Sequence, residues 1–306
     1  MRREVHRFAR AGWRNSKHRQ QWKNTLATYV YPVIGALPVQ DVDTALVFKV
    51  LEPIWLTRPE TATRVRGRIE RILDWAKAGS FREGENPARW RGHLDNLLPK
   101  RTKISKVEHH AALPYPEVPG FMAELRDRKS ISARCLEVTI LVASRTSEAI
   151  GARWDEIGFV ARVWTVPGAR MKAEKDHRIP LSQRVLAIFK DLQQRRESEF
   201  VFPGGRAGRQ LSNMAMLKML ALMDRDDLTV HGFRSSFRDW AAECTNFPSE
   251  VAEMALAHAV DDKVEAAYRR GDLFDKRRRL MNAWAEFCAK PPTTDAVMAL
   301  RSRGSR

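Results

Sequence analysis

Apolar residues recur every three or four positions along two stretches in the first third of the chain, residues 43–55 and 61–76. On the second stretch one helical face carries Val65, Ile69, Ile72 and Ala76. This spacing is typical of an α-helix that buries one side and exposes the other. The pattern therefore predicts a helical domain, which we place at residues 1–97.

A second face of residues 61–76 is basic. Arg64, Arg68 and Arg71 stand at i, i+4 and i+7, so their guanidinium groups would share one side of the helix and could follow a phosphate backbone. Taken alone, such a stripe is more often a solvated helix face. The first 25 residues add further basic residues and almost no acid, among them Arg14, Lys17 and Arg19. Two basic segments in one small helical domain favour DNA as the partner.

The periodic pattern is lost between Leu97 and Pro116, where the chain carries prolines and four spaced basic residues that include Lys103 and Lys106, and we place a linker at residues 98–113. This composition predicts a basic linker between domains that can itself follow a polyanion. His109 and His110 lie in the same segment, but adjacent side chains of a linker point apart and no third ligand is near. We therefore expect no metal site there.

Residues 114–290 mix helical and strand patterns. A helical run covers 130–142, an alternating stretch at 160–166 predicts a strand, and 170–181 is predicted to be a polar turn between two further strands. Helical spacing then continues towards the end of the chain. The expected fold is mainly α with a small antiparallel β-sheet in the second domain. The sequence contains neither a glycine-rich phosphate loop nor an internal repeat.

The last helical stretch is amphipathic. Leu280, Trp284, Phe287 and Cys288 fall at i, i+4, i+7 and i+8. This face either packs against its own domain or docks onto a neighbouring protomer, and the pattern alone does not decide between them. We expect residues 291–306 to be a disordered tail.

Charge sharpens the choice of partner. The 306 residues include 54 Lys and Arg against 37 Asp and Glu, a formal charge of +17. Residues 1–110 carry 22 of the basic and 11 of the acidic residues, a net of +11, which leaves +6 for residues 111–306. A surface this positive requires a polyanion or binds one non-specifically.

Other compositional features narrow the class of protein. Cys135, Cys244 and Cys288 are far apart, which excludes a disulfide scaffold and a zinc finger. No apolar run is long enough for a membrane span, and the first residues lack the apolar core of a signal peptide. We therefore expect a cytoplasmic protein associated with the nucleoid and not with a membrane.

A few polar positions of the second domain stand out for their chemistry, although each is weak by itself. Arg145 has Glu148 at i+3 as an ordinary ion-pair partner, and a His-x-x-Arg pattern such as His231 to Arg234 is expected about once by chance in such a chain. Lys172, His258 and Tyr268 complete the set.

The order of these residues is more specific than any one of them. Arg145 lies in Ala143-Ser-Arg-Thr-Ser-Glu148, and Lys172 lies on the predicted hairpin. His231 and Arg234 lie in His231-Gly-Phe-Arg-Ser-Ser-Phe237. His258 ends Leu256-Ala-His258, and Tyr268 follows it by ten residues. In this order they resemble the tyrosine recombinase (phage integrase) family, most of all the integrases of satellite prophages and genomic islands. The resemblance covers nearly the whole chain and implies a helical core-DNA-binding domain, followed by a tyrosine recombinase catalytic domain at 114–290.

The chemistry of phosphoryl transfer explains the residue types. Guanidinium groups bind two phosphate oxygens at once, so Arg145 and Arg234 are the expected clamp on the phosphodiester. Tyr268 is the expected nucleophile and needs a base, for which His231 is the candidate. His258 would hydrogen-bond the phosphate or support proton transfer. The resemblance gives Lys172 the protonation of the leaving 5′-oxygen, with Lys175 as the nearby alternative.

The resemblance also implies partners. The expected substrate is double-stranded DNA at attachment or core sites. The chain is expected to act on it as a homotetramer and can be a monomer when free in solution. A DNA-bending accessory protein is a further expected partner. No cofactor is expected, because the bond energy is retained in a covalent 3′-phosphotyrosyl intermediate, and no metal-binding cluster is present in the sequence.

Two departures from the family pattern stand out. Integrases of this type usually carry an N-terminal arm-binding domain, and this chain begins at the expected core-binding domain. Ala257 replaces a common glycine, which we expect to be a mild change.

The alternatives to a recombinase are a DNA-binding remnant without cleavage, a type IB topoisomerase with the same residues, and an RNA-binding protein. The sequence argues against an RNA-binding protein, because it lacks the exposed aromatic pattern of an RNA-binding surface.

Overall fold

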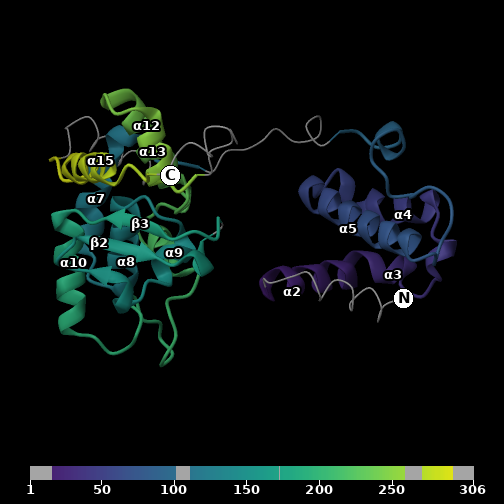
Figure 1. The fold of residues 1–306 in the computed structure, drawn as a ribbon, viewed down its shortest axis with the longest axis horizontal. Helices are drawn as coiled ribbons and strands as arrows, with labels where there is room; N and C mark the ends of the chain where they lie inside the picture. Colours follow the sequence, from purple (N-terminus) through teal and green to yellow (C-terminus); the bar gives the residue numbers. More distant parts are fainter. Residues whose placement is uncertain (1–15, 101–110, 172, 259–270, 292–306) are drawn as a thin grey trace. The chain divides into compact units, whose positions relative to one another are not determined.

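A computed structural model of the chain describes residues 16–100, 111–171, 173–258 and 271–291 (Figure 1). The chain divides into two compact units, residues 1–108 and 109–306. Of the sequence-predicted positions, Lys172 and Tyr268 lie outside the described residues, as do Arg14, Lys103, Lys106, the histidine pair 109–110 and the tail 292–306. The side chain of Lys17 is also outside the described part.

The first unit is helical, as the apolar spacing predicts. Its elements are α2 (Ser16–Thr25), the π-helical turn η1 (Leu26–Val30), α3 (Tyr31–Ile34), η2 (Val39–Asp41), α4 (Thr44–Trp55), α5 (Pro59–Ala78) and η3 (Leu94–Asn96). Asp43 caps α4 by accepting a hydrogen bond from the Leu46 backbone N–H at 2.9 Å. Proline at the first position of α5 fixes the backbone angle that a helix start needs.

Helix α5 buries the face that its sequence predicts. Val65, Ile69, Ile72 and Ala76 are all buried, and the first three belong to the core of the first unit, where α5 packs with α4 and η1. The apolar prediction for residues 61–76 is therefore confirmed. The core extends to Leu98, and the Trp55 indole donates to the Pro99 carbonyl at 2.9 Å. The first residues of the expected linker thus pack with this unit.

The second unit surrounds a small sheet with helices. Among the described residues, β1 (Ile157–Gly158), β2 (Val163–Val166) and β3 (His177–Pro180) form one antiparallel sheet in the order β1-β2-β3. The short turns are η4 (Tyr115–Glu117), η5 (Trp154–Glu156) and η6 (Gly168–Arg170). The helices are α7 (Val118–Asp127), α8 (Ile131–Leu141), α9 (Thr146–Ile150), α10 (Gln183–Gln194), α11 (Ala215–Ala221), α12 (Gly232–Cys244), α13 (Ser249–Ala255) and α15 (Phe274–Phe287).

The sheet corrects one detail of the sequence prediction. Residues 177–180, expected within a polar turn, form strand β3, where Trp164 pairs with Ile179 and Val166 with His177. Pairing with β2 satisfies the backbone of a segment whose polar residues suggest a turn. The hairpin loop that contains Lys172 therefore runs only from 167 to 176.

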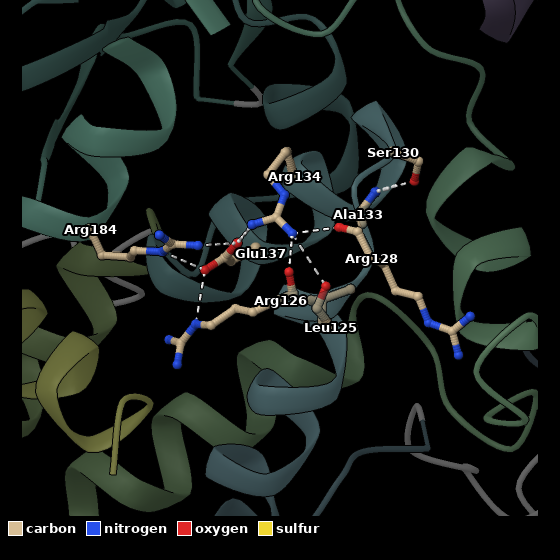
Figure 2. A network of polar contacts seen from close by, with 8 residues as sticks. All are labelled: Leu125, Arg126, Arg128, Ser130, Ala133, Arg134, Glu137 and Arg184. Carbon is tan, nitrogen blue, oxygen red and sulfur yellow. Dashed lines mark hydrogen bonds and ion pairs between the residues drawn. The ribbon is translucent and has the colours of Figure 1, made fainter. Parts of the chain in front are cut away.

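Helix α8 crosses the core of the second unit and carries a buried carboxylate. Glu137 is 0% exposed and is surrounded by Arg126 from α7, Arg134 from α8 and Arg184 from α10 (Figure 2). Their nitrogens lie 3.1, 2.6 and 2.8 Å from its oxygens. Arg134 also donates to the carbonyl of Arg126 in the last turn of α7 and to that of Arg128, which follows the helix. The Glu137 carboxylate thus connects helices α7, α8 and α10 through its ion pairs.

Helix α15 belongs to the core of its own unit. Leu280, Trp284 and Cys288 are fully buried, and the Trp284 indole donates to the Ile140 carbonyl at 2.9 Å. Its ring also packs against Phe237 and Trp240 of α12. The amphipathic face thus packs within its own domain, with α12, α13 and α15 gathered at one end of the unit (Figure 1).

Candidate active site

Arg145 lies immediately before α9 and is held by an acid of the same turn. Its Nη1 donates to Glu148 Oε1 at 2.8 Å, and its backbone N–H donates to Glu148 Oε2 at 2.9 Å. Its Nη2 reaches the carbonyl of Ala257 at 2.9 Å, 112 residues further along the chain. The simple ion pair with Glu148 therefore exists, and it orients the guanidinium towards the His258 segment.

Glu148 supports the Arg145 side chain, although the sequence pattern indicated it only as an ordinary ion-pair partner of Arg145. It is buried, and its own carbonyl accepts a hydrogen bond from Arg170 at 2.7 Å. Arg170 lies in the loop between β2 and β3, so this contact connects α9 to the hairpin. The i+3 spacing from Arg145 is the sequence signal that points to Glu148.

Arg234 lies in the first turn of α12 and is 5% exposed. Its Nη1 donates to the Ala143 carbonyl at 2.5 Å, and its Nη2 donates to the Leu256 carbonyl at 2.6 Å. Burial and the charge of Arg145 lower the pKa of Arg234 to about 10. Its buried Nε has no hydrogen-bond partner among the described residues. Arg234 is thus a poorly hydrated guanidinium that lies near enough to Arg145 for their charges to interact.

His258 completes this group. Its Nε2 lies 3.1 Å from Arg234 Nη2, and its Nδ1 lies 2.5 Å from Glu253 Oε2. The side chain remains 40% exposed, so one side of the ring faces solvent. The preceding residue, Ala257, has φ +49°, in the left-handed region that favours glycine. The glycine common at this position therefore has a conformational reason, and alanine adopts the same backbone.

Arg145, Arg234 and His258 are brought together by the structure, from α9, α12 and the segment after α13. His231 lies at the start of α12, exposed, three residues before Arg234. The backbone there is tightly packed, because a Cβ on Gly232 would lie 2.1 Å from the Ala111 carbonyl oxygen. Glycine in the His-Gly-Phe-Arg sequence is thus required by the close approach of residue 111.

Asp272, just before α15, is held by two arginines. Arg178 of β3 forms a bidentate pair with Asp272 at 2.8 and 2.9 Å, and the buried Arg277 donates to the Asp272 carboxylate at 2.8 Å and to the Arg178 carbonyl at 2.6 Å. Burial would raise the pKa of Asp272, but the hydrogen bonds and charges of the two arginines outweigh it and lower that pKa. Asp272 therefore ties the start of α15 to the strand that follows the Lys172 loop.

His177 of β3 is a neighbour of the site that the sequence did not indicate. Burial, followed by the charge of Arg277, lowers its pKa to about 4, and it hydrogen-bonds the backbone of Ala255. It is therefore a neutral ring between the hairpin and α13 at neutral pH. Its position was expected in a turn, where no packing partner could be predicted.

The basic face of α5 needs one correction. Arg64 and Arg71 are exposed, and Arg64 pairs with Glu60 one turn earlier. Arg68 is only 8% exposed, donates to the Gln21 carbonyl at 2.9 Å, and lies 5.3 Å over the Trp22 ring. Helix α2 packs over this part of α5, so Arg68 joins two helices and is not a free cation on the surface. Arg19, also predicted to contact DNA, is exposed on α2.

Among the described residues, no helix is both long and apolar enough to cross a membrane. Nor do those residues contain a cluster of three His, Cys, Asp or Glu side chains arranged to hold a metal ion.

Both units match families of known proteins. Residues 1–93 match the phage integrase central domain, and residues 113–272 match the phage integrase family. Prophage integrase IntA of Escherichia coli K12 is 30% identical over 290 residues, which cover 92% of this chain and 67% of that protein. The integrase of Enterobacteria phage P4 is 26% identical over 88% of this chain and 64% of its own length.

Solved structures share the fold. A lambda integrase fragment, crystallised as a dimer on a core site, aligns with a TM-score of 0.65 at 14% identity, over 85% of this chain and 93% of that one. The Tn1549 transposon integrase, in complex with circular intermediate DNA, aligns at 0.61 and 14% identity, over 87% and 98% of the two chains. The fold and site thus define a site-specific recombinase architecture built from a core-binding and a catalytic domain. The chain belongs to the phage integrase, or tyrosine recombinase, family.

Proposed function

We propose that the chain cuts and rejoins double-stranded DNA at specific sites through a 3′-phosphotyrosyl intermediate, and so integrates or excises a mobile element. The observation that carries this proposal is the convergence of Arg145 and Arg234 on residues 256–258. Two neighbouring positive charges favour an anion between them, and the pKa of Arg234 is lowered first by its burial and then by the charge of Arg145. In a basic protein with a recombinase fold, the anion bound between the two arginines would be a phosphate of the DNA.

The proposed reaction is a transesterification in two steps. Tyr268 gives its proton to His231, its oxygen bonds to phosphorus, and the bond to the 5′-oxygen breaks. Lys172, or its alternative Lys175, gives the leaving 5′-oxygen a proton. The 5′-hydroxyl of a second strand then gives its proton back to that lysine and attacks the phosphotyrosine, and Tyr268 leaves and takes its proton back from His231. Bonds formed and broken balance, so the reaction requires no nucleotide hydrolysis.

The first unit is proposed to hold the duplex. Exposed arginines on the helices of this unit would contact DNA phosphates. Basic residues near the start of the chain and in the linker would make further phosphate contacts. The set is Arg64, Arg71 and Arg19, together with Arg14, Lys17, Lys103 and Lys106. The functional assembly is proposed to be a tetramer on two core sites, one active site for each exchanged strand, with an accessory DNA-bending protein.

A nicked suicide duplex tests the function. Its sequence is taken from a direct repeat that flanks the gene, and covalent adducts are counted by denaturing gel. The wild-type chain should form adducts, Tyr268→Phe should form none while it binds the duplex normally, and the matched variant Tyr29→Phe in the first unit should behave as wild type. Adducts in Tyr268→Phe would contradict the assignment of the nucleophile.

Two other outcomes separate the alternatives. Relaxation of a supercoiled plasmid without a recombination site, at the same rate as one that contains it, would indicate a topoisomerase. Tight binding to the flanking repeat without any adduct in the wild-type chain would indicate an inactive remnant.

A further inference from the structure

Glu253 of α13 contacts His258 through both its main chain and its side chain. The His258 backbone N–H donates to the Glu253 carbonyl at 3.0 Å, and Glu253 Oε2 lies 2.5 Å from His258 Nδ1. The two residues are five apart, on either side of the left-handed turn at Ala257. The carboxylate is thus placed beside the ring by the way in which α13 ends.

The contacts on the two sides of the ring agree on one tautomer. A guanidinium nitrogen can only donate, so the contact of Arg234 Nη2 with His258 Nε2 at 3.1 Å requires a lone pair on Nε2. A neutral imidazole then carries its proton on Nδ1 and donates it to the Glu253 carboxylate. Neither contact would be satisfied by the other tautomer.

The carboxylate is itself held in place. Arg238 of α12 donates from Nε to Glu253 Oε1 at 2.6 Å, which leaves Oε2 for the imidazole. Burial would raise the pKa of Glu253, but the hydrogen bonds from Arg238 and His258 outweigh it and lower that pKa. Glu253 is therefore an ionised acceptor at neutral pH.

We propose that Glu253 is the positioning residue of His258 in DNA strand cleavage, an inference that rests on the proposed function. It holds Nδ1–H of the ring whether or not Nε2 is protonated, so Nε2 is the nitrogen turned towards the phosphate clamp of Arg145 and Arg234. Glu253 acts through the ring and not on the substrate, as an orienting carboxylate does beside a catalytic histidine in other enzymes.

The tautomer provides a test that does not depend on activity. In the full chain with ¹⁵N-labelled histidine, at a pH where the ring is neutral, His258 should show the Nδ1–H form. Glu253→Ala should weaken this preference, because only the contact with Arg234 then favours it, while Glu286→Gln, which alters an exposed carboxylate of α15, should keep it. The signals of the other histidines report whether each variant is folded. An Nε2–H form in the wild-type chain, or an unchanged pattern in Glu253→Ala, would overturn the proposal.

Kinetics separate positioning from a purely structural role. Glu253→Ala should slow single-turnover adduct formation about 10- to 100-fold, part of the 10²- to 10⁴-fold that positioned proton transfer contributes. Its affinity for the duplex should stay within about twofold of wild type, and Glu253→Gln, which keeps an acceptor of the same size, should recover part of the rate. On a His258→Ala background the Glu253→Ala change should have no further effect.

Additive losses in the double variant would assign Glu253 a structural role and overturn the proposal. If the wild-type chain forms no adduct, the proposed function fails, and the tautomer of His258 still decides whether Glu253 orients the ring. The two failures are therefore distinguishable.

Discussion

Arg145 and Arg234 donate hydrogen bonds to the carbonyls of two successive residues, Ala257 and Leu256, at 2.9 and 2.6 Å. The two arginines come from separate helices, so the backbone before His258 serves as a common support for both. Any displacement of this backbone would move both guanidinium groups at once.

Replacing either arginine by lysine should slow adduct formation by about 10²-fold, because an ammonium cannot reproduce the bidentate geometry of a guanidinium. The measurement is single-turnover cleavage of the suicide duplex by Arg145→Lys and Arg234→Lys. Arg64→Lys keeps the charge of an exposed residue outside the site and should cleave as wild type. Equal rates for all three variants would contradict the clamp.

Ala257→Gly should stabilise the second unit by about 0.5–1 kcal/mol. The left-handed backbone at φ +49° costs an L-residue roughly 1–2 kcal/mol, and the greater freedom of glycine in the unfolded chain offsets part of this gain. The midpoint of urea unfolding, at constant slope, measures the change. A lower midpoint would show that the turn does not strain alanine.

The α5 arginines should separate folding from DNA binding. Arg68→Ala should destabilise the first unit by about 1–3 kcal/mol, since it removes a buried hydrogen bond and the packing over Trp22. Arg71→Ala should leave stability nearly unchanged and reduce the slope of log affinity against log salt by about one. Thermal unfolding and duplex titrations at several salt concentrations measure the two effects. The prediction fails if Arg71→Ala leaves the salt slope unchanged.

Glu137→Gln should destabilise the second unit by about 2–4 kcal/mol, because the surrounding arginines lose their common counter-charge in a buried place. The loss should stay below the full cost of breaking a buried pair, because Arg126 and Arg184 reach solvent. Arg184→Gln, which removes the most exposed of these partners, should cost less than about 1 kcal/mol. Equal losses in the two variants, measured by urea unfolding, would contradict a network centred on the carboxylate.

Acidification below neutral pH should weaken the second unit through His177. Its pKa is about 4 in the folded chain against an ordinary value of 6.5, so between these values the unfolded chain binds more protons than the folded one. Stability from the neutral ring is complete above pH 6.5 and is lost as the pH falls towards 4, by at most about 1.4 kcal/mol per pH unit. His177→Gln should flatten this part of the unfolding profile. An unchanged profile in that variant would assign the loss to other groups.

The sequence predicted the elements whose apolar residues repeat with a helical period. Helix α5 and helix α15 bury the faces that their spacing indicates, and the family order of Arg145, Arg234 and His258 corresponds to a real cluster. Periodicity says which side of a helix is apolar, and for α15 it left open which surface covers that side.

Contacts between distant segments could not be predicted in this way. Arg68 has the spacing of an exposed stripe but is covered by α2, because the position of a neighbouring helix is not encoded in the spacing of one helix. Strand β3 is stabilised by pairing with β2 and not by its own pattern. Glu253 becomes noticeable only when the turn at Ala257 brings it to the ring of His258.

The burial of α15 changes how assembly on DNA can be studied. Removing the chain after Gly271 would take Trp284 and Leu280 out of the core, and losing a buried Trp alone typically costs about 3–5 kcal/mol. That is a large part of the stability of an ordinary domain. A truncated chain that fails to assemble would therefore report a damaged fold, and protomer contacts are better probed by substitutions on the outer surface of this helix, such as Lys276 and Asn282.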